Sequence, residues 1–135
     1  MTLRWGVIGY GRFGQLHSGA IARTAGAELA AIATASEASA ERASAEHSGA
    51  RVTTDWRTLI DDPAIDVIDI VAPNHRHAEM AIAALEAGKH VLVEKPLATT
   101  LADCDRLVET VDRTGGLLSV GFELRLSSQW RTIKT

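Results

Sequence analysis

Cysteine and proline are scarce in this chain. A single cysteine among 135 residues excludes an internal disulfide framework and a zinc site built from cysteines, and it favours a reducing, cytoplasmic compartment. Only 3 prolines exclude collagen-like and mucin-like architectures, and a hydrophobic content of 46% excludes a disordered chain. We therefore expect an ordinary soluble globular protein with one domain, or two if the second is very short.

Excess basic charge and long apolar runs are also missing. The formal net charge is −3, so no basic surface invites nucleic acid and none is predicted as a partner. No apolar run reaches the roughly 18 residues that a membrane span needs, so no membrane association is predicted. Gly6 interrupts the N-terminus before the apolar core of a signal peptide could form. Nucleic-acid-binding and membrane-embedded classes are thereby excluded.

The sequence does contain a regular alternation of apolar and amphipathic segments. Short buried strands are predicted at 3–8, 28–34, 51–54, 66–72, 90–93 and 117–121. Helices are predicted between them at 12–24, 37–47, 56–60, 76–87 and 100–113, and the buried face of the first helix is predicted to carry Phe13, Leu16, Ala20 and Ile21.

This alternation predicts an α/β fold, a Rossmann-type, doubly wound and mainly parallel sheet with helices on both faces. Ligands of such sheets bind beyond the carboxyl ends of the strands, where the strand order reverses. The residues that follow each strand are therefore the candidates for function.

A glycine motif, G-x-G-x-x-G, follows the first predicted strand. Its residues are Gly9, Tyr10, Gly11, Arg12, Phe13 and Gly14. The first glycine permits a tight turn, the second lets the backbone approach a pyrophosphate, and the third allows close contact between helix and strand. The helix that follows points its N-terminal amides at the phosphates. The motif predicts a dinucleotide-binding loop, and a glycine-rich turn without a ligand is the alternative.

Hydroxyl side chains occupy the place where the dinucleotide fingerprint expects an acid. Thr34 lies 20 positions after Gly14, and Ser36 follows closely. An acid at this position would hold the ribose 2′-hydroxyl of NAD and repel the 2′-phosphate of NADP. Two hydroxyls can instead hydrogen-bond that phosphate, which favours NADP. NAD stays open as the alternative because no arginine stands at these positions.

A polar turn follows the fourth predicted strand, at Pro73, Asn74, His75, Arg76 and His77. The proline sets a rigid turn, and the asparagine and histidine side chains can donate hydrogen bonds to a ligand at the carboxyl edge of the sheet. Two histidines could indicate a metal, but neither a cysteine nor a further histidine stands nearby, so no metal is predicted. The other histidines, His17, His47 and His90, belong to no recognisable cluster.

Lys95 stands between Glu94 and Pro96, directly after the fifth predicted strand. An ammonium group at the carboxyl end of a strand can stabilise alkoxide character on a substrate oxygen or donate a proton to it. The alternative is a surface ion pair between Glu94 and Lys95. Taken without further context, these residues favour the ion pair.

Three stretches, considered together, resemble one enzyme family. They are GVIGYG at 6–11, APNHRH at 72–77 and ALEAGKHVLVEKPLA at 84–98. The long third run is highly specific, and the order of the three is similar to the N-terminal domain of the Gfo/Idh/MocA oxidoreductases, the glucose-fructose oxidoreductase and inositol dehydrogenase family. The segment GFELR at 121–125 resembles the crossing into the second domain of that family.

The resemblance implies transfer of a hydride between NAD or NADP and a sugar, polyol or related alcohol or carbonyl substrate. It implies that Lys95 is catalytic and touches the reacting hydroxyl. It also implies a cofactor site. The contacts expected there come from the glycine motif at 9–14, Thr34, Ser36, Ala72, Pro73, Asn74, His77, Glu94, Lys95, Pro96 and Arg125.

The resemblance also implies a domain organisation. Residues 1–121 are expected to form the dinucleotide-binding domain, and residues 122–135 to begin a second, catalytic domain that the chain leaves incomplete. The 135 residues alone are then expected to be inactive, and the full-length protein to form a homo-oligomer. The alternative is a stand-alone module that binds or senses NAD(P) without catalysis.

Overall fold

A single sheet of six parallel strands organises the protein, seen here in a computed structural model that describes residues 1–134. The strands are β1 (Leu3–Ile8), β2 (Ala27–Ala33), β3 (Arg51–Thr53), β4 (Val67–Ile70), β5 (His90–Glu94) and β6 (Leu118–Gly121). Their order is β3-β2-β1-β4-β5-β6, and every neighbouring pair is parallel. The chain moves outward from β1 to β3 and then returns to β4, so the order reverses between β1 and β4. The predicted doubly wound Rossmann-type sheet is confirmed.

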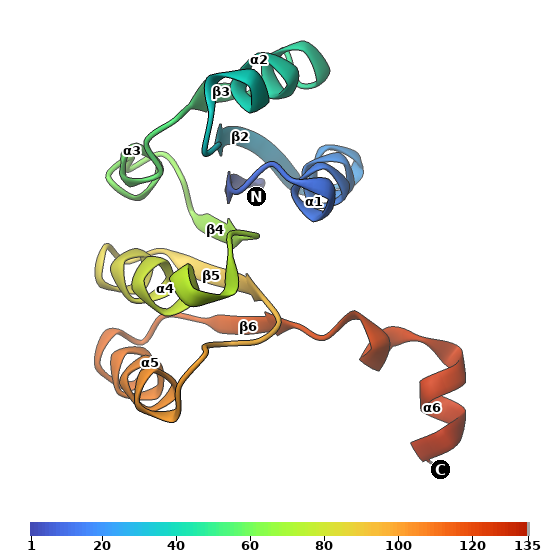
Figure 1. Cartoon of the computed structure of the whole chain (residues 1–135), viewed down its shortest axis with the longest axis vertical. Helices are drawn as coiled ribbons and strands as arrows, with labels where there is room; N and C mark the ends of the chain where they lie inside the picture. The colour runs from blue at the N-terminus through green and yellow to red at the C-terminus, as the bar shows by residue number, and fades with distance from the viewer. Residues whose placement is uncertain (135) are drawn as a thin grey trace.

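Helices cover both faces of this sheet. They are α1 (Arg12–Arg23), α2 (Glu37–Glu46), α3 (Arg57–Ile60), α4 (His77–Glu86), α5 (Leu101–Thr114) and α6 (Ser128–Lys134), with 3-10 turns η1 (Asn74–Arg76) and η2 (Glu123–Leu126). Figure 1 shows α1 and α2 on one face and α3, α4 and α5 on the other, while η2 and α6 extend away beyond β6. Across residues 1–134, none of the helices has the length and apolarity that crossing a membrane requires.

Two apolar clusters separate the sheet from its helices. On the side of α3, α4 and α5, fully buried side chains such as Ile68, Leu85 and Leu107 form the larger cluster. On the side of α1 and α2, Val7 and Ile32 belong to a smaller one. All residues of β4 are buried, as is typical of a central parallel strand, although one of them is an aspartate.

The face that α1 presents to the sheet differs from the prediction. Gly14, Ser18 and Ile21 are buried, whereas Phe13 and Leu16 are 45% and 59% exposed. Small side chains at the contact let the helix approach β1 closely, so the larger apolar side chains point outward. The predicted buried face was therefore wrong for Phe13, Leu16 and Ala20 and right for Ile21, because helical periodicity alone does not show which of two adjoining faces meets the sheet.

Element ends also differ from the prediction near the carboxyl edge. β4 ends at Ile70, two residues before the predicted end at Ala72, and the segment that follows turns at Pro73. The helix predicted from Arg76 begins instead as the 3-10 turn η1 at Asn74 and continues as α4. Residues 71–76 therefore line the edge of the sheet as a loop and a tight turn.

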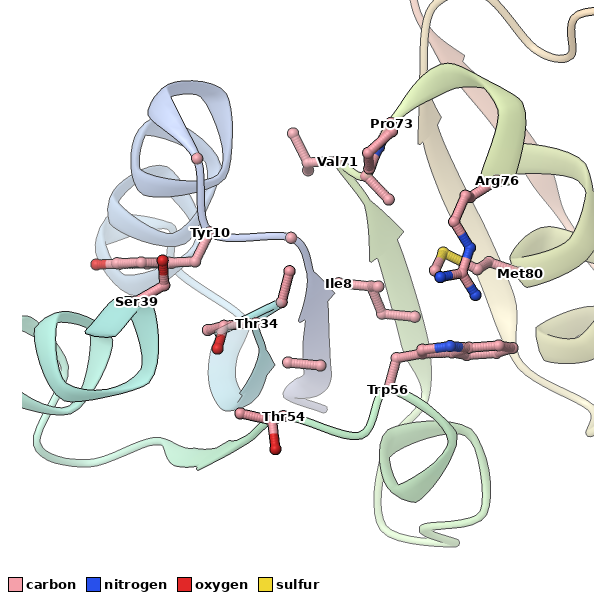
Figure 2. A pocket seen from close by; sticks show the side chains of 15 residues that line it. Ile8, Tyr10, Thr34, Ser39, Thr54, Trp56, Val71, Pro73, Arg76 and Met80 are labelled. Atoms are coloured by element: carbon pink, nitrogen blue, oxygen red, sulfur yellow. The ribbon is translucent and has the colours of Figure 1, made fainter. Parts of the chain in front are cut away.

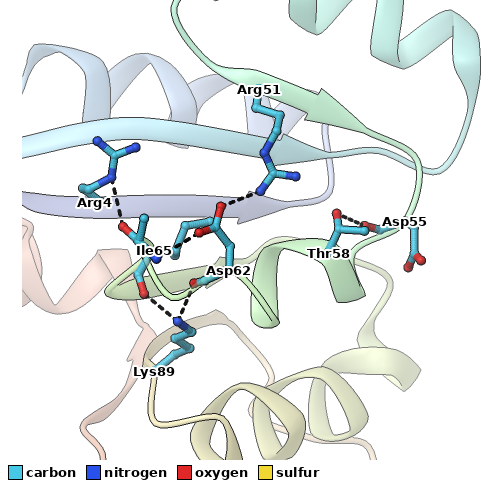
Figure 3. A network of polar contacts seen from close by, with 8 residues as sticks. Arg4, Arg51, Asp55, Thr58, Asp62, Ile65 and Lys89 are labelled. Carbon is cyan, nitrogen blue, oxygen red and sulfur yellow. Dashed lines mark hydrogen bonds and ion pairs between the residues drawn. The ribbon is translucent and has the colours of Figure 1, made fainter.

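A buried lysine joins the loop before β4 to the loop before β5. Lys89 is only 6% exposed, and its ammonium donates hydrogen bonds to the backbone carbonyls of Asp62 (2.6 Å) and Ile65 (2.8 Å). Figure 3 shows this contact beside the ion pair of Arg51 with the Asp62 carboxylate, at 2.8 Å. The network lies at the amino ends of the strands and supports the edge opposite the candidate site.

Candidate functional site

A cleft of about 640 Å³ opens where β1, β2 and β4 end. Its lining includes several of the residues predicted from sequence: Gly9, Tyr10, Gly11, Thr34, Ala72 and Pro73. In Figure 2, Tyr10, Thr34 and Ser39 line one side of the cleft, and Trp56, Arg76 and Met80 line the other. The cleft therefore lies at the reversal of strand order, where such sheets bind ligands.

The glycine loop has the backbone geometry that its sequence predicts. Gly9 has φ = +107°, and a Cβ there would lie 2.5 Å from the carbonyl oxygen of Val71. A Cβ on Gly14 would overlap the carbonyl of Gly9. A Cβ on Gly11, in contrast, would meet nothing within 4 Å. Two of the glycines are thus required by the fold, and the middle one keeps a space open for a ligand.

No side chain of residues 1–134 caps the first turn of α1. Gly11 is the N-cap and supplies no side-chain hydrogen bond, and the turn contains no acidic residue. α2 and α5 differ, because Ser36 and Thr100 cap them with their hydroxyls. Uncapped amides at a helix N-terminus bind anions well, so this end of α1 fits the pyrophosphate of a dinucleotide.

The two hydroxyls predicted to favour NADP already have partners in the chain. Thr34 is buried and its hydroxyl donates to the carbonyl of Ser36 at 2.9 Å. The Ser36 hydroxyl accepts from the amide of Ser39 at 3.3 Å as the N-cap of α2. Both residues therefore shape the turn after β2, and no carboxylate from the described part of the chain lines the edge of the cleft there.

Tyr10 belongs to the glycine loop, and its buried side chain reaches the end of α2. Its hydroxyl donates to the carboxylate of Glu46 at 2.5 Å, and His47 packs edge-on against the ring at 5.8 Å between centroids. Burial and the hydrogen bond to Glu46 raise the pKa of the Tyr10 hydroxyl well above its usual range. The phenol therefore stays neutral and fastens the loop to the end of α2.

His77 joins the loops that follow β4 and β5. Its ring nitrogens lie 2.7 Å from the carbonyl oxygen of Pro96 and 2.8 Å from that of Ala72, and the side chain is buried. Asn74 is exposed at the start of η1 and does not line the cleft. The predicted polar turn after β4 thus combines a buried ring that holds two loops with an exposed amide at the edge.

A second cleft, of about 600 Å³, lies beyond β5 and β6. It brings Glu94 and Arg125 together with Phe122 and with His17 of α1. Lys95 and Pro96 are exposed at this edge, and the Lys95–Pro96 peptide bond is cis. The glycine loop and the segment after β5 therefore stand at the same edge of the sheet.

Lys95 faces the first turn of α1. Its ammonium nitrogen lies 5.8 Å from the centre of the Phe13 ring, within range of a cation–π contact. Within residues 1–134, no ion pair joins the side chains of Glu94 and Lys95, so the surface ion pair expected from the two residues alone is absent. Glu94 turns instead toward His17.

Four residues at the two clefts are missing from the site that the sequence predicts. Trp56, Arg76 and Met80 line the first cleft, and the guanidinium of Arg57 covers the Trp56 ring at 4.5 Å. Only Arg76 lies inside a motif that the sequence singles out. His17 contacts Asp69, 52 positions away, and no spacing rule predicts a contact across that distance.

The protein combines a doubly wound parallel sheet with a helix that follows a glycine loop and has an uncapped N-terminus. That N-terminus lies where the strand order reverses. These features define the class of Rossmann-type dinucleotide-binding domains. Residues 3–122 match the oxidoreductase family with an NAD-binding Rossmann fold, Gfo/Idh/MocA. The chain belongs to this family.

Two relatives with known names are dehydrogenases. Inositol 2-dehydrogenase of Salmonella typhimurium is 36% identical over 137 residues, which covers 99% of this chain and 41% of the relative. Levoglucosan dehydrogenase of Pseudarthrobacter phenanthrenivorans is 51% identical over 73 residues, covering 54% of this chain and 19% of the relative. The chain thus spans less than half the length of these relatives.

Solved structures agree with the assignment. Biliverdin reductase of Synechocystis, in complex with biliverdin and NADP+, has a TM-score of 0.90 and 34% identity, covering 98% of this chain and 42% of that one. Scyllo-inositol dehydrogenase of Lactobacillus casei, with NAD(H) and scyllo-inositol, has a TM-score of 0.92 and 29% identity, covering 99% and 40%. These two neighbours bind different nicotinamide cofactors.

Proposed function

We propose that this chain is the NAD(P)-binding domain of an oxidoreductase that transfers a hydride between a nicotinamide cofactor and a sugar, polyol or related alcohol or carbonyl compound. One observation carries the proposal: the ammonium of Lys95 lies 5.8 Å from the ring of Phe13, inside the glycine motif. Hydride transfer from a bound nicotinamide to a carbonyl needs a loop that holds the pyrophosphate of the cofactor and a cation that meets the substrate oxygen. Both stand at one edge of the sheet. Family membership and the dehydrogenase relatives support it.

Different parts of the chain would form different parts of the cofactor site. Gly9, Gly11 and Gly14 would shape the loop, and the uncapped amides of α1 would bind the pyrophosphate. The loop that His77 holds in place would form the neighbouring wall. The bound nicotinamide would supply or accept the hydride.

Lys95 would act on the substrate oxygen. Hydride transfer to a carbonyl leaves negative charge on that oxygen, and hydride removal from an alcohol requires loss of its proton. An ammonium group in contact with the oxygen stabilises the charge or exchanges the proton. Lys95 is exposed at the edge of the sheet, where a substrate can reach it.

We infer a preference for NADP over NAD. Among residues 1–134, no carboxylate lines the first cleft to repel a 2′-phosphate or to hold the ribose 2′-hydroxyl. The guanidinium of Arg76 adds a cation to the opposite side of the same cleft, where it pairs with Glu79 at 3.3 Å. The hydroxyls of Thr34 and Ser36 support the preference less than their positions suggest, because both have partners in the chain.

We infer further that residues 122–135 begin a second domain. The family match ends at residue 122, and η2 and α6 leave the sheet there (Figure 1). Leu126 and Ile133 are 75% and 73% exposed, so this segment offers apolar side chains that a second domain can cover. A second domain that closes over Lys95 would complete the substrate site.

A lysine substitution in the full-length protein tests the proposed function. Lys95→Ala is expected to lower kcat on polyols or aldoses by about 10²-fold or more, the usual effect of losing a positioned proton-transfer group. The dissociation constant for NADP should stay within about threefold, because Lys95 does not line the first cleft. Arg113→Ala, which removes an exposed ion pair with Glu86, is the control and should leave both values unchanged.

Turnover that survives Lys95→Ala would contradict the catalytic role of Lys95. A full-length parent protein that binds NADP but turns over none of these substrates would favour the alternative, a module that binds NAD(P) without catalysis. A parent protein that binds neither nucleotide in calorimetric titration would contradict both.

A further inference from the structure

An imidazole lies between two carboxylates behind the end of β5. His17 of α1 places its Nδ1 2.8 Å from the Oδ2 of Asp69 and its Nε2 3.3 Å from the Oε1 of Glu94. The Asp69 side chain is 1% exposed, and its other oxygen, Oδ1, has no hydrogen-bond partner among residues 1–134. His17 is therefore the neutralising partner of a buried carboxylate and reaches the edge of the site with its other nitrogen.

Two carboxylates can both accept from one imidazole only when both ring nitrogens carry a proton. The hydrogen bond to Asp69 raises the pKa of His17 most, against partial burial, and the negative charges of Asp69 and Glu94 raise it further. The charged groups that face the ring are Asp69 from β4 and Glu94 from β5, with Glu123 and Arg125 of η2 lining the same cleft.

Glu94 is held at both of its oxygens. Oε1 faces His17, and Oε2 accepts from the backbone amide of Lys95 at 3.2 Å. Gly121 of β6 leaves the space for this arrangement, because a Cβ there would lie 2.8 Å from the same Oε1. The carboxylate therefore links the imidazole to the backbone from which Lys95 projects.

We infer that His17 is a positioning residue for Lys95: anchored by Asp69, it holds the Glu94 carboxylate, and Glu94 holds the amide of Lys95 at the carboxyl end of β5. The inference deepens the proposed function and rests on it for the catalytic consequence. Loss of the second proton from His17 would remove the donor that Glu94 needs and leave a lone pair facing a carboxylate. Lys95 would then lose its fixed position.

Nuclear magnetic resonance of the protein labelled with 15N-lysine and with 13C-histidine tests the chain of contacts without turnover. The amide signal of Lys95 is expected to titrate at the same midpoint as the His17 ring, above about 6.5, the usual histidine value. The amide of Lys89 donates to Ala84 and serves as the internal control, which should not follow that midpoint.

Two substitutions complete the test. Glu94→Gln is expected to lower the midpoint of His17 and to abolish the response of Lys95, while His75→Gln, an exposed histidine of η1, should change neither. The inference would be overturned if the amide signal of Lys95 in the parent protein did not change as His17 titrates. A His17 midpoint unchanged by Glu94→Gln would do so as well.

Turnover then separates this inference from the proposed function. His17→Gln is expected to lower kcat about ten- to hundredfold, as misplacement of a catalytic group does. In the parent protein, kcat should decline at high pH as His17 loses its second proton, and this decline should be absent from the variant. KM for the nucleotide should stay within about threefold. If Lys95→Ala abolishes turnover and His17→Gln retains both kcat and the pH profile, the positioning role is wrong and the proposed function stands. If Lys95→Ala is active, the catalytic role proposed for Lys95 fails, and the amide titration alone decides whether His17 holds Lys95.

Discussion

The three glycines of the loop after β1 differ in what a side chain would meet there. Gly9 and Gly14 face backbone carbonyls, whereas Gly11 faces open space at the cleft. A substitution at Gly11 therefore affects the ligand and not the fold. This separates a binding loop from a glycine-rich turn, which the motif by itself leaves undecided.

Gly11→Val is expected to weaken NADP binding by about tenfold or more, because a branched side chain would occupy the space through which the pyrophosphate approaches the backbone. The melting temperature should change little, since a Cβ there meets no atom within 4 Å. Calorimetric titration and thermal unfolding measure the two effects. Gly14→Ala is the matched control and should destabilise the fold. Unchanged affinity in Gly11→Val would refute the binding loop.

A second prediction at this scale concerns the turn after β2. Thr34→Asp is expected to reverse the nucleotide preference toward NAD, because a carboxylate accepts from the ribose 2′-hydroxyl and repels the 2′-phosphate. The ratio of the two dissociation constants is the measurement. Thr24→Asp adds a carboxylate at the C-terminal end of α1, the end that does not face the glycine loop. This variant controls for the added charge and should leave the ratio of the two dissociation constants unchanged. A parent protein that already prefers NAD would show the inferred preference to be wrong.

At the scale of elements, polar contacts fix the loops that lead into β4 and β5. Lys89 donates to two backbone carbonyls from a buried position, while Arg51 pairs with the Asp62 carboxylate near the surface (Figure 3). The two cations converge on one loop but differ in burial. Their removal should therefore have very different effects on stability.

Lys89→Met is expected to lower the free energy of unfolding by about 1–3 kcal/mol, since it leaves the buried carbonyl of Ile65 without this donor and the carbonyl of Asp62 with the amide of Ile65 alone. Arg51→Met should cost less than about 1 kcal/mol, because an exposed ion pair contributes little. Urea unfolding of both variants measures the difference. Equal effects would show that the buried ammonium does not fix this loop.

For the whole molecule, the buried carboxylate of Asp69 makes stability depend on pH. The folded protein raises the pKa of His17 above its unfolded value, so its contribution is complete below about 6.5 and is lost as the pH rises through the raised pKa. The contribution of Asp62 to stability has the opposite dependence on pH. The amide of Ala64 and the charge of Arg51 lower its pKa, so its contribution is lost at acid pH.

The free energy of unfolding is therefore expected to fall as the pH rises from 6.5 to 9. Urea denaturation at several pH values tests this. His17→Gln should destabilise the protein more at pH 6 than at pH 9 and flatten the decline, whereas His75→Gln should not alter it. A decline of the same size in His17→Gln would assign the effect to another group.

The sequence by itself determined the α/β class, the order of the elements, the glycine loop and the family. Each depends on local signals: alternating apolar segments, glycines at the ends of helices, and the long run from Ala84 to Ala98. Residue patterns carry such information because neighbours in sequence share one element.

Only the tertiary structure decided which face of α1 meets the sheet, and that His17 holds Asp69 and Glu94. It also brought Trp56 and Arg76 to the cleft and turned Glu94 away from the Lys95 side chain. These contacts join three or more elements across the parallel sheet. Side-chain neighbours there depend on strand order and helix approach, which no local spacing encodes.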